Sequence, residues 1–138
     1  KMTEMTDSCA FLDAQNRCMV HDFRPGVCRL FPLGRYYEEH SFKYFLQVYE
    51  CRNTHTAKVK IKKWLEEPEL KRQEAFISRW HYFLKNIQER LDEKNDNGLR
   101  RQVSMFILQK FYLEPFPADG DFYALFEMRV AEAEKINI

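Results

Sequence analysis

The stretch from Pro68 to Glu93, "PELKRQEAFISRWHYFLKNIQERLDE", decides the fold that we expect for this chain of 138 residues. Apolar residues recur in it at intervals of three and four, which is the spacing of one face of an α-helix. Pro68 suits the first position of a helix, where its missing N–H costs nothing. We therefore predict one long helix over residues 68–93, and its apolar face comprises Ile77, Trp80, Leu84, Ile87 and Leu91.

Two more helices are predicted after the polar loop at residues 95–98. Asp119 or Asp121 can cap the third helix, and Pro115 and Pro117 end the second. Because the loops are short, the three helices should pack antiparallel as a bundle. Their apolar faces comprise Leu99, Val103, Phe106, Ile107 and Phe111 in the second helix, and Phe122, Leu125, Phe126, Val130 and Ala133 in the third.

The first half of the chain has a different pattern. Residues 8–35 contain too many prolines and glycines for a helix longer than a turn or two. Residues 35–50, "RYYEEHSFKYFLQVYE", predict a β-hairpin with a polar turn at residues 38–41. The fold class is therefore α+β, mainly α. We expect an irregular cysteine-containing loop and hairpin module over residues 1–55, packed on a helical bundle over residues 56–138 as one compact domain.

Composition narrows the function classes. Apolar residues make up 45% of the chain, which is enough to build a core without disulfides. The sequence has no apolar run of about 18 residues, so we expect no membrane span. The net charge of +1 gives no general argument for a nucleic-acid partner. No apolar signal segment is visible, and the expected location is the cytoplasm.

Four cysteines are spaced Cys9-x8-Cys18-x9-Cys28-x22-Cys51. None forms a C-x2-C pair, so spacing alone leaves three alternatives open: a metal site, disulfides, or small buried apolar side chains. Disulfides would need an oxidising compartment, for which the sequence gives no signal. His21, three residues after Cys18, is a further candidate ligand.

The residues around Cys28 favour a reactive or metal-binding thiol. Arg24 and Arg29 flank it and would favour its thiolate form. The tetrapeptide Arg24–Val27 has proline second and glycine third, which predicts a type II turn. Such a turn would reverse the chain and bring Cys28 back toward Cys18.

Residues 9–35, "CAFLDAQNRCMVHDFRPGVCRLFPLGR", resemble the second half of the YkgJ-like cysteine-cluster proteins, a family described as zinc- or iron-chelating. The family's N-terminal CxxCxxCC segment is absent, so we expect either a fragment or a chain that has lost that part of the site. The resemblance implies a bacterial protein in which Cys9, Cys18 and Cys28 ligate metal, and it favours an iron–sulfur cluster over zinc. Cys51 lies outside the family pattern and is added from the residues alone. The positions that match are Cys9, Cys18, Arg24, Pro25, Cys28, Arg29, Phe31 and Pro32.

The expected function is metal binding through a cysteine-ligated zinc or iron–sulfur centre with a redox role, and the substrate stays open. The alternative is a binding module in which the metal is structural. It would present the basic surface Lys58–Trp64 to a protein or nucleic-acid partner. Whether the protein is an enzyme is left open at this point.

Overall fold

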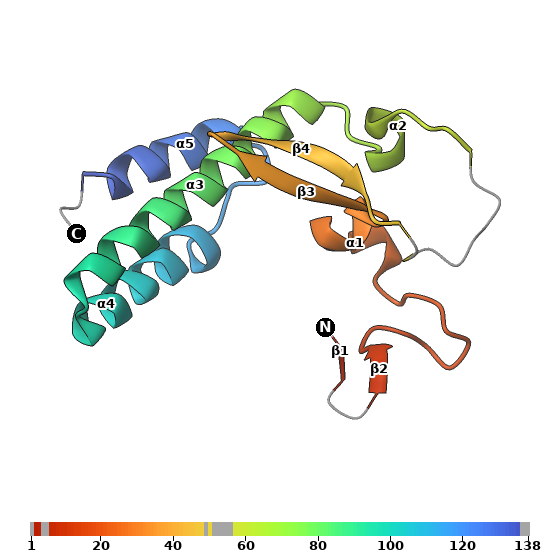
Figure 1. Cartoon of the computed structure of the whole chain (residues 1–138), viewed down its shortest axis with the longest axis horizontal. Helices are drawn as coiled ribbons and strands as arrows, with labels where there is room; N and C mark the ends of the chain where they lie inside the picture. Colours follow the sequence, from red (N-terminus) through yellow and green to blue (C-terminus); the bar gives the residue numbers. More distant parts are fainter. Residues whose placement is uncertain (1, 4–5, 49, 51–56, 136–138) are drawn as a thin grey trace. The chain divides into compact units, whose positions relative to one another are not determined.

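The computed structural model describes residues 2–3, 6–48, 50 and 57–135, with side chains from residue 8 onward (Figure 1). It divides into two compact units. The cysteine unit comprises Lys1–Tyr36 and Tyr44–Glu66, and the helical unit comprises Tyr37–Lys43 and Glu67–Ile138. The predicted α+β, mainly α class is confirmed. Over the described residues, no helix has the length and apolar character that crossing a membrane requires.

The cysteine unit is built from short elements, as the density of prolines and glycines predicts. The strands β1 (Met2–Thr3) and β2 (Thr6–Cys9) pair antiparallel, with Met2 opposite Cys9. The other short elements are the 3-10 helix η1 (His21–Phe23), α1 (Gly26–Leu30) and α2 (Ile61–Leu65).

The predicted type II turn at Arg24–Val27 is wrong. That turn needs a positive φ at Gly26, and Gly26 instead has a negative φ and begins α1. Pro25 caps this helix with φ −53° and ψ 150°, and its carbonyl accepts hydrogen bonds from the amides of Cys28 (2.9 Å) and Arg29 (3.1 Å). The fixed φ of proline suits a residue that begins a helix as well as a turn. The chain therefore continues as a helical turn at this point.

The predicted hairpin is present, with a tighter turn than expected. β3 (Leu33–Glu38) and β4 (Ser41–Leu46) pair through a two-residue loop. Its residues Glu39 and His40 have φ of 22° and 65°, and positive φ is what the favoured two-residue hairpin loops require.

The hairpin tip belongs to the helical unit. Ser78 donates a hydrogen bond to the His40 carbonyl (2.5 Å), and Tyr82 donates one to the Ser41 carbonyl (3.3 Å). The Tyr37 ring stacks on His81 with centroids 3.6 Å apart. These contacts fix the tip against α3 (Leu70–Lys94).

All three predicted helices of the bundle are present. α3 begins two residues after Pro68, and α4 (Asn97–Ile107) follows a short connection capped by Asp96. α4 continues directly into η2 (Leu108–Leu113), which has π-helical geometry. α3 and α4 lie side by side in Figure 1, and α5 (Phe122–Ala133) completes the unit.

Asp121, one of the two predicted capping residues, begins α5. Its carboxylate accepts hydrogen bonds from the amides of Tyr123 (3.0 Å) and Ala124 (3.2 Å). Arg72 of α3 donates to the same carboxylate (2.6 Å). That hydrogen bond, aided by the helix amides, lowers the pKa of Asp121 below its usual value. One carboxylate therefore caps α5 and ties it to α3.

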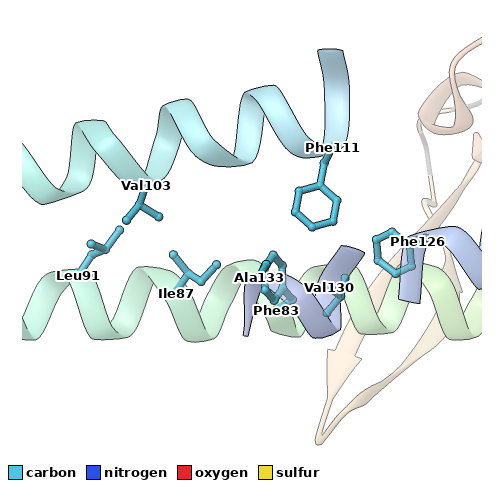
Figure 2. Packing of buried hydrophobic residues seen from close by; sticks show 8 residues of the cluster. All are labelled: Phe83, Ile87, Leu91, Val103, Phe111, Phe126, Val130 and Ala133. Carbon is cyan, nitrogen blue, oxygen red and sulfur yellow. The ribbon is translucent and has the colours of Figure 1, made fainter. Parts of the chain in front are cut away.

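The core of the helical unit lies where the apolar faces of these helices meet (Figure 2). Ile87 and Leu91 of the predicted stripe are buried, and Trp80 and Leu84 pack against the core. Phe83, only 4% exposed, belongs to the same face although it was not assigned to the stripe. The buried cluster comprises Phe83, Ile87, Leu91, Val103, Phe111, Phe126, Val130 and Ala133.

A buried arginine holds the end of the π-helical segment. Arg129 of α5 is 2% exposed and donates hydrogen bonds to three backbone carbonyls. The acceptors are Lys110 (2.9 Å), Glu114 (3.0 Å) and Pro115 (2.8 Å). A guanidinium presents several donors in a fixed plane, which lets one side chain serve several carbonyls at the end of a helix.

Candidate metal centre

Cys9 and Cys18 belong to one folded-back segment of the cysteine unit. The Cys9 carbonyl accepts a hydrogen bond from the amide of Leu12 (3.3 Å), and Leu12 pairs antiparallel with Cys18. The amide of Met19 donates to the Phe11 carbonyl (2.9 Å), which continues this pairing. Leu12 thus contacts the backbone of Cys9 on one side and pairs with Cys18 on the other.

Asp13 stabilises the turn between these two cysteines. Its carboxylate accepts hydrogen bonds from the amides of Gln15 (2.9 Å) and Arg17 (2.8 Å). Asn16 takes a left-handed φ of 59°, which asparagine tolerates well. The local sequence Asp-x-x-Asn-Arg therefore returns the chain and places Cys18 opposite Leu12.

Cys28 lies on α1 and is exposed. The neighbouring Arg29 donates a hydrogen bond to the Leu65 carbonyl (2.7 Å), so it connects α1 to the end of α2. Arg24 is half-buried, and its buried Nε has no hydrogen-bond partner among the described residues. The support that these two arginines give to the Cys28 thiolate stays a prediction.

Of the two remaining candidate ligands, His21 and Cys51, the structure describes only His21. His21 begins η1 with its side chain 63% exposed, and its Nδ1 lies 3.6 Å from an oxygen of Asp22. Cys51 lies outside the described residues. Within the described part of the chain, no three His, Cys, Asp or Glu side chains lie close enough together to hold a metal ion.

The three described cysteines are all free thiols. Cys9 and Cys18 are partly exposed to solvent, and Cys28 is exposed. Four thiolates are the donor set that structural zinc and iron–sulfur clusters use, and the cysteine unit contains that number in its sequence. The thiol donors therefore fit a metal by their chemistry, whereas the described candidate ligands do not lie close enough together to form a site.

The basic surface Lys58–Trp64 also belongs to the cysteine unit. Its four lysines are exposed, and none makes a salt bridge within the described residues. Trp64 is 45% exposed, whereas the next residue, Leu65, is buried. α2 thus buries one apolar side chain and leaves an aromatic ring beside the positive charges.

Sequence reasoning missed the contact that joins α1 to α2. Arg29 and Leu65 are 36 residues apart, and the acceptor is a backbone carbonyl. No residue type marks a carbonyl acceptor, so no local pattern could have paired them.

Comparison of the chain with protein-family models, curated proteins and solved structures finds no match.

Proposed function

We propose that the chain binds a metal through the thiolates of Cys9, Cys18, Cys28 and Cys51, as a cysteine-ligated zinc or iron–sulfur protein. The observation that carries the proposal is that its described cysteines are free thiols with access to solvent. A free cysteine that only fills space is among the most buried of residues. The exposure of Cys28 in particular argues against a packing role.

Metal binding in small sites is coupled to folding. A preformed site rarely exists in the metal-free chain, and ligation itself supplies the free energy that brings the thiols together. The turn stabilised by Asp13 already holds Cys9 and Cys18 on one segment. The proposal requires Cys28 and Cys51 to join that segment, with His21 as the substitute donor if one thiol stays apart. Bound there, zinc would cross-link the short elements, and a cluster would add electron transfer.

Cobalt titration of the reduced protein without oxygen tests this proposal, because cobalt–thiolate coordination gives an intense absorption band. We expect a saturable band in the unmodified protein. Cys28→Ser should weaken cobalt binding by at least about 100-fold, since loss of an outer-shell partner alone costs 10–100-fold. Val27→Ser is the matched control, because Val27 is the adjacent exposed residue of α1 and has no donor atom. Equal affinities for the Cys28→Ser variant and the unmodified protein would contradict the assignment.

The second candidate function is the binding module that presents Lys58–Trp64, and the exposed Trp64 ring supports it. In that case the metal is structural. Cys28→Ser should then lower the melting temperature of the metal-loaded protein as well as its cobalt affinity. A cobalt band lost without any loss of thermal stability would contradict a structural role for the metal.

A further inference from the structure

A hollow of about 100 Å³ lies in the helical unit, and none of the candidate metal ligands belongs to its lining. Its walls come from α3, η2, the connection after η2, and α5. Most of the lining surface is apolar. The lining consists of seven aromatic residues, namely Phe76, Trp80, Phe111, Tyr112, Phe116, Phe122 and Phe126. We call this site the aromatic hollow.

Ring-to-ring packing fixes the walls of the aromatic hollow. Phe76 contacts Phe126 edge to face with centroids 4.6 Å apart, and it contacts Phe122 at 5.1 Å. Trp80 packs on Phe111 at 4.8 Å. Such pairs are favourable beyond the area that they bury. The rings are therefore positioned by one another, without any bound molecule.

The π-helical geometry of η2 contributes two consecutive residues to the lining. Phe111 is 8% exposed and forms an inner wall, whereas its neighbour Tyr112 is 65% exposed and lies at the rim. Short π-helical segments occur frequently at functional sites. Arg129 holds the end of this segment through its bonds to Lys110, Glu114 and Pro115. The wall is thus braced by a buried side chain that does not itself line the hollow.

A hollow of this kind leaves apolar ring surface in contact with water. Protein interiors are normally filled to crystal-like density, and small-molecule sites are concave and mostly apolar. An apolar cavity of about 150 Å³ holds a benzene molecule. The aromatic hollow has about two-thirds of that volume and opens to solvent, so it would hold one six-membered ring in part, with the substituents in solvent.

The charged side chains near the aromatic hollow carry both signs and are paired with one another. The Arg129 guanidinium already lies over the Phe116 ring at 3.9 Å, and Arg72 lies over Tyr123 at 4.7 Å. The neighbouring carboxylates of Glu114 and Asp121 are paired with these same arginines. No charged residue among those described lines the hollow. An ion bound among these rings would therefore lose hydration without a charged partner in the lining, which favours a neutral ring.

We propose that the aromatic hollow is a binding site for a small neutral aromatic molecule, of the phenol class in size. This inference is independent of the metal proposal, because the hollow lies in the helical unit and the cysteines lie in the other.

Fluorine NMR of 4-fluorophenol, titrated with the full chain, tests this inference. We expect saturable line broadening with a dissociation constant of about 1 mM, which corresponds to about 4 kcal/mol for a ligand of this size. In a Trp64→Phe background, Trp80 is the remaining tryptophan, and its fluorescence should change over the same concentration range. Tetramethylammonium should not displace the probe.

Two variants of neighbouring residues locate the binding. Tyr112→Ala removes a rim ring and should weaken binding at least about fivefold, or roughly 1 kcal/mol. Leu113→Ala is the matched control, since Leu113 is 60% exposed and does not line the hollow. Tyr112→Leu gives a second test if the Tyr112→Ala variant has a lowered melting temperature.

Three results would overturn the inference. The first is broadening that does not saturate, and the second is an equal loss of binding in the Leu113→Ala variant. The third is probe binding that falls as protein concentration rises while sedimentation shows dimers, because the hollow would then be covered by a second copy of the chain.

Discussion

Replacement of Arg129 by methionine is expected to destabilise the helical unit by about 3 kcal/mol or more, because three backbone carbonyls each lose a hydrogen bond. Methionine fills a similar volume but offers no donors. The carbonyls of Lys110, Glu114 and Pro115 would each lose a hydrogen bond beneath the surface. A buried polar group left without a partner costs about 1–3 kcal/mol. Urea unfolding followed by circular dichroism measures the loss.

Arg79→Met is the matched control for Arg129→Met. Arg79 joins α3 to α5 through Glu134 (2.7 Å) and Glu127 (3.4 Å), but its side chain is 36% exposed. Surface ion pairs contribute about 1 kcal/mol or less. Similar losses for the two variants would show that Arg129 acts as an ordinary surface charge, contrary to its described environment.

Phe83→Ala is the second large effect that we expect. Phe83 lies in the core with its ring 5.6 Å from both Trp80 and Phe111. Truncation of a buried phenylalanine costs about 3–5 kcal/mol, because apolar contacts are lost and a cavity remains. Met128→Ala on α5 is the control, since Met128 is 52% exposed and should change stability by no more than about 0.5 kcal/mol. A loss below about 1 kcal/mol for Phe83→Ala would contradict the assigned core.

The helical unit was the more predictable part of the chain. Regular spacing on α3 predicts a buried face, because side chains three and four residues apart lie on one side of a helix. Asp121 was predicted as a cap because its side chain matches the free amides of a helix start. The role of Arg129 is not predictable from the sequence, because three of its partners are backbone carbonyls and any residue can supply a carbonyl.

The π-helical segment also left no clear sequence signal. Phe111 continues the three-and-four spacing of the second helix, so the widened turn is hidden behind a regular pattern. Tyr112 lies outside the apolar face predicted for that helix. Only the structure places it with Phe116 and Phe122 around one hollow.

The candidate metal centre shows what spacing does and does not determine. The cysteines identify a donor set, because thiol chemistry depends on residue type. Their separation in space depends on the backbone between them, and here Pro25 begins a helical turn instead of a reversal. The approach of Cys28 to Cys18 that the predicted turn would have produced therefore has no local support.

Metal content after purification without oxygen is the most direct test of the proposed function. The protein should carry about one zinc ion, or iron with acid-labile sulfide, per chain, as four-thiolate sites do. A coloured protein with a broad visible absorption would support the iron–sulfur form of the proposal. A colourless protein that holds no zinc or iron, and takes up neither after reduction and reconstitution, would contradict the account.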